Sequence, residues 1–288
     1  MGSGWRMNTL PYVRYREFFV AAAALWLVVA CDVRAETVRA GGTGAATELL
    51  KRLGAAFSAR EPGTTLEVIP SLGSTGAIAA VADGEIDVAV SGRLLRVEEI
   101  GKGLTGEILA RSPFGLASSE RDPGGLASRD VAAFFSSTTA IWPSGAPVRV
   151  VLRPKSESDT ARLAGLFPGM AEAIDRVRVR PEVVVAATDQ DNAAAAETIP
   201  GSLAAISLAQ IRTENRALRF LSIDGVMPTL EAFESGRYPY GKDFQFIVAA
   251  TASPTTRRFV EFAGSAAAAE VLRAAGCLPS TVRIDPVR

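Results

Sequence analysis

Three turns rich in glycine and hydroxyl residues each follow a short β-type run and precede a helical pattern. They are GGTGAAT at residues 41–47, SLGSTGAIAAV at 71–81 and LRPKSESDT at 152–160. A helix N-terminus presents free backbone N–H groups and the positive end of its dipole, so turns of this kind bind anions. One such turn alone is more often a plain helix cap, which contributes about 1 kcal/mol. Their repetition predicts a site for one small, multiply charged anion.

Hydroxyl and guanidinium groups are expected to complete the donor shell of this anion. Arg153 suits bidentate recognition of an oxyanion, although a lone arginine is more often a surface residue. A fourth stretch, VSGRLL at 90–95, ends a predicted strand with a further serine and arginine. The residue types therefore predict binding roles for Thr43, Ser74, Thr75, Ser91, Arg93, Arg153, Ser158 and Thr160.

The first turn also has part of a dinucleotide-binding fingerprint, because Gly42 and Gly44 carry its spacing. That fingerprint needs an acidic residue at the end of the next strand, where it binds a ribose hydroxyl. Glu67 lies in the middle of that strand instead, and a second glycine turn follows it. The chain also lacks the Gly-Lys-Ser/Thr of nucleotide-hydrolase phosphate loops. We therefore expect a small anion and no nucleotide.

Composition limits the chemistry further. The 288 residues contain no histidine, which removes hydrolases with an imidazole base and most zinc sites. Lys+Arg and Asp+Glu are equal at 31 each, so no basic surplus indicates nucleic acid. No carboxylate cluster has metal-like spacing. We expect a binding protein without catalytic residues, metal or cofactor.

The first 35 residues have the pattern of an export signal, with arginines before the apolar stretch FFVAAAALWLVVA at 18–30. That stretch is short for a membrane span, so an anchor is the second interpretation. Cleavage after Ala35 would release a soluble protein. The segment ending at Cys31 resembles a lipobox, a weaker match, and would give a lipid-anchored protein. Cleavage after Ala35 leaves Cys277 as a lone cysteine, expected to be a packing residue.

Beyond residue 36, β-branched runs alternate with amphipathic helical stretches, which predicts an α/β fold with a mostly parallel sheet. One helix should start near residue 45, bury Leu49, Leu53 and Phe57, and end at Pro62-Gly63. Strands are expected at 37–40, 64–70, 86–91, 148–153, 181–187, 203–208 and 243–250.

The stretches GGTGAA, SLGSTGAI, DVAVSGRLL and LRPKSESDT, in this order, resemble the successive anion-contacting loops of the substrate-binding protein of phosphate ABC transporters, a type 2 periplasmic binding protein. The resemblance extends over most of residues 37–280. It implies two lobes joined by a hinge, each a mixed sheet flanked by helices. Lobe 1 would comprise 36–112 and 210–288, and lobe 2 would comprise 113–209.

The resemblance also implies which residues bind the ligand in the cleft between the lobes. By matching loops, the contacts are Thr43, Gly44, Ala45, Ser74, Arg153, Ser158, Asp159 and Thr160. The last loop matches only with a one-residue insertion, and Asp159 stands where the family has glycine. Phosphate binders of this family also place an aspartate at the position of Gly92, where it accepts the proton of hydrogen phosphate. Asp159 or Asp189 could replace that aspartate, or the site could prefer another tetrahedral oxyanion.

The function expected is capture of an inorganic oxyanion, phosphate first, by an exported monomeric protein. It would deliver the anion in the periplasm to the permease subunits of an ABC transporter in the inner membrane. One alternative is a sulfate or molybdate binder, and another is the sensory binding subunit of a membrane signalling system. An enzyme acting on phosphoesters ranks last, because the chain offers no imidazole.

Overall fold

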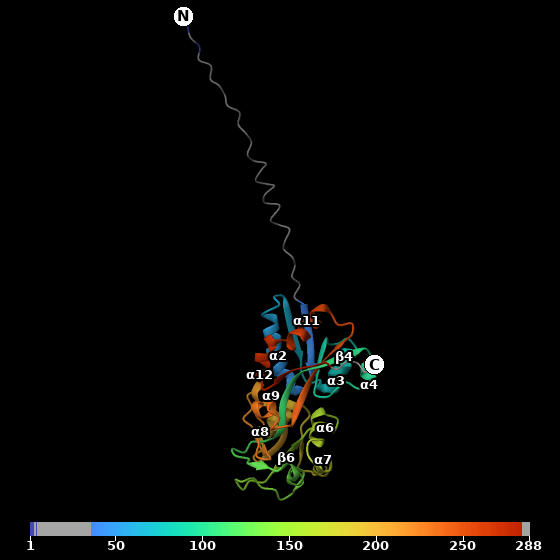
Figure 1. The fold of residues 1–288 in the computed structure, drawn as a ribbon, viewed down its shortest axis with the longest axis vertical. Coiled ribbons are helices and arrows are strands. Elements are labelled where there is room, and N and C mark those ends of the chain that lie inside the picture. Colours follow the sequence, from blue (N-terminus) through green and yellow to red (C-terminus); the bar gives the residue numbers. More distant parts are fainter. Residues whose placement is uncertain (3, 5–35, 284–288) are drawn as a thin grey trace. The chain divides into compact units, whose positions relative to one another are not determined.

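The fold, drawn in Figure 1 from a computed structural model, is described for residues 36–283 and for residues 1, 2 and 4. The expected export signal, apart from those three residues, lies outside the described residues, as do Cys31 and Ala35. In the described part, the strands are β1 (Glu36–Gly42), β2 (Thr64–Ile69), β3 (Val88–Ser91), β4 (Leu104–Ser118), β5 (Gly125–Leu126), β6 (Arg149–Leu152), β7 (Val184–Val185), β8 (Ser202–Ser207), β9 (Arg219–Phe220), β10 (Ser222–Ile223), β11 (Gly241–Ala249) and β12 (Leu278–Arg283). The helices are α2 (Thr47–Ser58), α3 (Gly73–Ala82), α4 (Val97–Ile100), α5 (Val131–Ser136), α6 (Ser158–Ala164), α7 (Met170–Arg178), α8 (Asp189–Thr198), α9 (Leu208–Thr213), α10 (Leu230–Glu234), α11 (Pro254–Ala263) and α12 (Ala266–Ala274), with 3-10 turns η1 (Gly44–Ala46) and η2 (Ser128–Asp130) before α2 and α5.

One strand, β4, joins the two halves of the main sheet, whose strand order is β2-β1-β3-β11-β4-β8-β6-β7 (Figure 1). Its residues 104–113 pair antiparallel with β11, and residues 114–117 pair antiparallel with β8. On one side of this centre β1 pairs parallel with β2 and β3, and on the other β6 pairs parallel with β7 and β8. The sheet is therefore mixed, parallel toward both ends and antiparallel at the centre, and the predicted α/β fold is confirmed.

Helices cover both faces of the first half of the sheet. Side chains of a strand alternate between its faces, so Phe244 and Phe246 of β11 pack toward α2, α11 and α12, while Ile247 packs toward α3. The predicted apolar stripe of α2 is confirmed, because Leu53 and Phe57 are buried in the first of these clusters.

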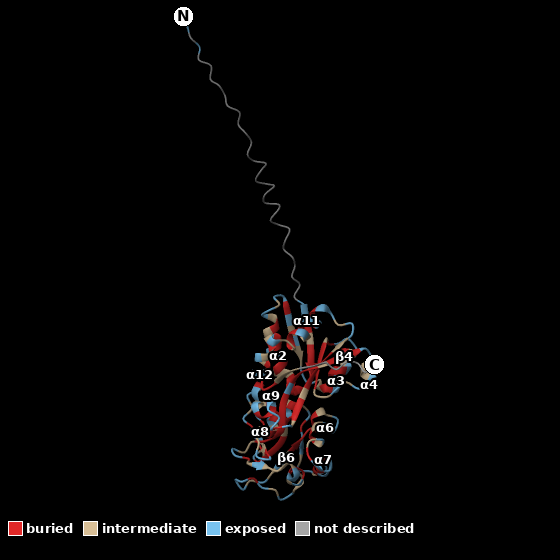
Figure 2. Cartoon of the chain, in the orientation of Figure 1, coloured by how far each residue is buried: buried red, intermediate tan, exposed pale blue. Residues whose placement is uncertain are grey.

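The second half of the sheet is covered in the same way. Phe114 and Leu116 of β4 lie in a cluster with residues of α5, α6 and α7, whereas Ala117 faces a cluster that contains Ala193 and Ala196 of α8. Figure 2 shows the buried residues concentrated along the strands and the inner faces of the helices. Because parallel strands need cover on both faces, this layering explains why their sequences read as continuous apolar runs.

The predicted strands are confirmed, although β7 is reduced to two residues. β4, the fifteen-residue centre of the sheet, was not predicted as a strand. The resemblance assigns residues 112–123 to a crossover into the second lobe, and Glu107, Arg111 and Pro113 interrupt the apolar pattern of 104–118. Pro113 lies where β4 passes from one half of the sheet to the other, opposite Gly241.

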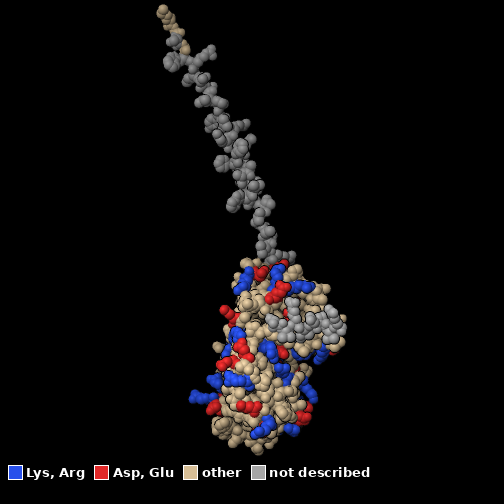
Figure 3. Space-filling model, in the orientation of Figure 1, with Lys and Arg blue, Asp and Glu red and all other residues tan. Residues whose placement is uncertain are grey.

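Charged side chains of both signs are interspersed on the face seen in Figure 3. Among the described residues, no helix has the length and apolar character to cross a membrane.

Cys277 is buried, and burial raises the pKa of its thiol to about 12. The expectation that Cys277 is a packing residue is confirmed.

The Phe57→Ala substitution tests the core beside α2. The ring of Phe57 lies with its centroid 5.4 Å from that of Phe259 and 5.6 Å from that of Phe262. Its removal should lower the free energy of unfolding by about 3–5 kcal/mol, measured by urea denaturation. Val97→Ala, at an exposed position, should change it by less than about 0.5 kcal/mol. A cost for Phe57→Ala no greater than that of the control would contradict this packing.

Candidate functional site

The predicted turns lie where parallel strands end. β1 leads into η1 and α2, β2 into α3, β6 into α6, and β7 into α8. In open α/β sheets the carboxyl ends of the strands form the edge at which ligands bind. Side chains from these turns contact one another across large sequence separations, so the fold brings helix N-termini together around one cluster of polar groups.

Asp189, the first residue of α8, is the centre of this cluster. Its Oδ2 accepts hydrogen bonds from the hydroxyl of Thr43 at 3.0 Å and from the backbone N–H of Ala45 at 2.9 Å. Its Oδ1 accepts one from Nε of Arg153 at 3.0 Å. The donors predicted for an external anion in the first and third turns therefore hold a carboxylate of the chain itself.

Arg153 is buried, and its whole guanidinium is engaged. Nη1 donates to the carbonyl of Ala186 at 2.7 Å, and Nη2 pairs with a carboxylate oxygen of Glu157 at 3.2 Å. With Nε on Asp189, the group contacts two carboxylates and one carbonyl. This orients the guanidinium rigidly at the end of β6.

Lys242, in β11, supplies a second buried cation. Its Nζ forms an ion pair with Asp159 and donates to the hydroxyl of Thr43 at 3.1 Å. β11 runs antiparallel to β3, so the start of β11 lies at the edge where β3 ends. A Cβ on Gly92 would lie 2.8 Å from Cε of Lys242. The end of the Lys242 side chain thus occupies the space that the Cβ of an aspartate at position 92 would need.

The two carboxylates respond differently to this environment. Burial raises the pKa of Asp159; the Lys242 ammonium opposes the rise, and the Asp189 carboxylate adds to it. Burial also acts to raise the pKa of Asp189, but Lys242, Arg153 and the donors of the first turn outweigh it, so that pKa lies below its ordinary value. With both carboxylates ionised, Asp159 and Asp189 balance Arg153 and Lys242, and Glu157 adds a further carboxylate on Arg153.

The second turn joins the cluster through Ser74. Its hydroxyl lies 3.3 Å from the hydroxyl of Ser158 and accepts the backbone N–H of Gly92 at 3.0 Å. Thr160 donates instead to the carbonyls of Arg153 at 3.2 Å and Pro154 at 2.9 Å, which closes the turn before α6. Ser74 and Ser158 are therefore in the cluster, whereas Thr160 supports it.

Three of the predicted binding residues form a separate set of contacts outside the cluster. The hydroxyl of Ser91 donates to the carbonyl of Arg93 and accepts its N–H, at 2.7 and 3.1 Å. The guanidinium of Arg93 forms a bidentate pair with Glu99, at 2.9 and 2.7 Å, and donates to the carbonyl of Leu94 at 3.0 Å and to the Thr75 hydroxyl at 3.4 Å. The structure therefore does not bring Ser91, Arg93 and Thr75 into the cluster around Asp189.

A cavity of about 60 Å³ lies beside the cluster, and we call it the inner cavity. Gly44 and Gly73 expose backbone to it, and Arg153, Glu157 and Thr188 contribute side chains. Its volume corresponds to a few water molecules, which is the size class of a tetrahedral oxyanion. In the described part of the chain, no group of three or more Cys, Asp and Glu side chains could hold a metal ion.

Sequence reasoning missed Lys242 and considered Asp189 only as a replacement proton acceptor. The available signal was a lysine at the start of an apolar run, YGKDFQFIV, which is unusual in a buried strand. Its position at the site depends on the antiparallel pairing of β11, which periodicity does not reveal.

Comparison with known proteins gives a family and a fold. The sequence model of a family described as the PBP superfamily domain matches residues 32–267. Among curated proteins, no sequence matches. A phosphate ABC transporter substrate-binding protein from Clostridium perfringens, solved with bound phosphate and described as putative, is similar with a TM-score of 0.72 and 16% identity, over 85% of this chain and 100% of that one.

Two further solved structures show the same likeness. An ABC-type phosphate transport receptor from Vibrio cholerae gives a TM-score of 0.61 at 15% identity, over 85% of this chain and 100% of that one. The periplasmic molybdate-binding protein of Azotobacter vinelandii gives 0.57 at 12% identity, over 84% and 98%. At these identities the likeness shows a shared fold.

The Lys242→Met substitution tests the buried ion pair. It leaves Asp159 without its cation and should lower the free energy of unfolding by about 3–5 kcal/mol in urea denaturation. The double variant Lys242→Met/Asp159→Asn should recover part of this loss, because no unpaired charge remains. Lys155→Met breaks an exposed pair with Asp175 and should cost less than about 1 kcal/mol. A double variant as unstable as the sum of the two single variants would contradict the pairing.

Proposed function

The chain belongs to the PBP superfamily, whose model covers most of its length, and on that premise we propose that it is a solute-binding protein for a small oxyanion, phosphate first. The observation that supports this best is the Asp189 carboxylate, held by a hydroxyl, a backbone N–H and a guanidinium. A carboxylate is itself an oxyanion. The donors around it are therefore already placed to bind one.

The incoming anion takes the place of Asp189 on the first turn. Its oxygens accept the N–H of Ala45 and the hydroxyl of Thr43, while Arg153 and Lys242 offset its charge. Helix N-termini contribute further positive potential, roughly half a unit charge each. No bond is made or broken in the ligand, so the function is capture and release, without catalysis.

Binding is coupled to movement of two lobes, which the family resemblance predicts at 36–112 with 210–288 and at 113–209. Thr43 and Ala45 then belong to lobe 1 and Asp189 to lobe 2, so their hydrogen bonds cross the cleft and break when it opens. Residues 218–238 contribute to the apolar clusters of the second half of the sheet. This favours the start of β11, rather than residue 210, as the point where the chain returns to lobe 1.

The protein acts in the periplasm as a monomer and delivers its ligand to the permease of an ABC transporter. An export signal at 1–35 supports this location, with release after Ala35 or a lipid anchor at Cys31 as the two forms. Phosphate is the first candidate because similar folds include a structure with bound phosphate. Molybdate is the second, because a molybdate binder shares the fold.

A ligand-stripped sample should show a melting temperature that rises with phosphate concentration, because binding to the folded state alone stabilises it. A panel of phosphate, sulfate, molybdate and tungstate, measured by thermal shift at fixed ionic strength, identifies the preferred anion. No rise with any of the four would contradict the proposed function.

The Thr43→Val substitution removes one donor at nearly constant volume. Loss of a hydrogen bond to a charged ligand costs about 1.5–3 kcal/mol, so affinity for the preferred anion should fall about ten- to hundredfold in calorimetry. Thr64→Val is the matched control, since this buried threonine hydroxyl bonds the carbonyl of Glu61 outside the site. An unchanged affinity in Thr43→Val would show that the anion binds elsewhere.

The Asp189→Asn substitution removes the internal competitor but keeps its shape. The variant should be less stable without ligand, because Arg153 loses a charged partner, and it should gain more melting temperature from phosphate than the original protein does. Differential scanning calorimetry with and without phosphate measures both effects. A folded variant that no longer responds to phosphate would make Asp189 part of the binding shell and not a competitor.

A further inference from the structure

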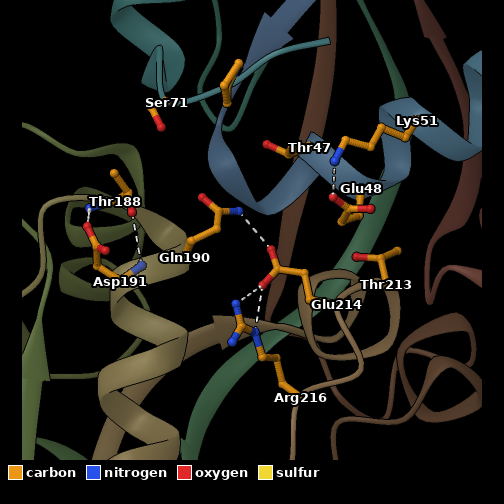
Figure 4. A pocket seen from close by; sticks show the side chains of 11 residues that line it. Thr47, Glu48, Lys51, Ser71, Thr188, Gln190, Asp191, Thr213, Glu214 and Arg216 are labelled. Carbon is orange, nitrogen blue, oxygen red and sulfur yellow. Dashed lines mark hydrogen bonds and ion pairs between the residues drawn. The ribbon is translucent and has the colours of Figure 1, made fainter.

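A second and larger cavity, of about 660 Å³, opens beside the inner cavity (Figure 4). We call it the outer pocket. It is lined by the first turns of α2, the segment after β2, the start of α8, and the end of α9 with the residues that follow. Ser71, Thr188 and Gln190 line both spaces, so the outer pocket continues directly to the donors of the oxyanion site. A bare tetrahedral anion would leave it empty.

The charged groups of the outer pocket are already paired with one another. Lys51 pairs with Glu48 at 2.6 Å, and Arg216 pairs with Glu214 at 2.8 Å and with Glu197 at 3.1 Å. Asp191 adds a carboxylate that accepts the N–H of Thr188 at the start of α8. Carboxylates outnumber cations in the lining, so the pocket disfavours a second anionic group on the ligand.

Uncharged polar groups remain available. The hydroxyls of Thr47 and Ser71 and the Oε1 of Gln190 have no hydrogen-bond partner among the described residues, and Figure 4 shows these three side chains around the same space. The amide nitrogen of Gln190 is fixed, since it donates to the carbonyl of Gly44 at 2.9 Å and to Glu214 at 2.8 Å. These groups can form hydrogen bonds with hydroxyl groups of a ligand.

We infer that the ligand is a phosphomonoester of a small polyol, with its phosphate in the oxyanion site and its hydroxyl-bearing group in the outer pocket. This rests on the proposed function and extends its ligand by one substituent. Gln190 forms the wall between the two parts. Thr47 faces the substituent alone, whereas Ser71 lines both parts.

Isothermal titration calorimetry on ligand-stripped protein tests the inference with glycerol 3-phosphate, inorganic phosphate and glycerol. Glycerol 3-phosphate should bind at least tenfold more tightly than inorganic phosphate, and glycerol alone should give no heat of binding. Thr47→Trp fills the outer pocket without removing a hydrogen bond. This substitution should lower the affinity for glycerol 3-phosphate at least tenfold and change the affinity for inorganic phosphate less than threefold.

Two further variants complete the test. Thr251→Trp, at an exposed position that lines neither space, should leave both affinities unchanged. Thr47→Leu is a smaller obstruction at the same position, which lines only the outer pocket, and it replaces Thr47→Trp if that variant does not fold.

The outcomes separate the two proposals. Inorganic phosphate that binds as tightly as the ester, or an obstruction that weakens both ligands alike, overturns the inference and leaves the proposed function standing. Absence of binding by the ester, phosphate, sulfate, molybdate and tungstate overturns both.

Discussion

The buried carboxylate of Asp189 is the interaction on which the arrangement of this protein depends. It receives donors from the turn after β1 and from Arg153 at the end of β6, and so ties together segments more than a hundred residues apart. Without it, the first-turn donors and the guanidinium would face one another with no acceptor between them. One acceptor position, held by Asp189 or by an anion in its place, therefore receives hydrogen bonds and positive charge from the strand ends, the helix starts and the two cations.

Charge balance then constrains the ligand. Asp159, Asp189 and Glu157 already neutralise the two cations of the cluster, so a doubly charged anion adds uncompensated negative charge to a buried site. Displacement of Asp189 toward solvent, or uptake of a proton by Asp159, relieves this. Burial already raises the pKa of Asp159, which makes it the group that takes the proton more readily. Selectivity therefore comes from local pairing within the site rather than from overall charge.

The sequence predicted most strands, the helix α2, the three turns and the fold class, because each depends on local periodicity or on turn residues. It did not predict β4, whose apolar pattern is interrupted by Glu107, by Arg111 and, at the junction of the two halves of the sheet, by Pro113. Lys242 was missed because its place follows from strand pairing and not from any neighbouring residue. Arg93 was assigned to the site by its position after a strand, and only its contact with Glu99 shows where its guanidinium lies. Local sequence patterns thus could not predict strand pairing or contacts between residues far apart in the sequence.

The central claim is that an external oxyanion replaces Asp189 on the first turn. A crystal structure of the protein grown with the tightest-binding anion of the thermal-shift panel tests it most directly. The account predicts oxyanion density within hydrogen-bonding distance of the Ala45 N–H and the Thr43 hydroxyl, with the Asp189 carboxylate moved off both donors. An Asp189 that keeps both hydrogen bonds while the anion lies elsewhere would contradict it.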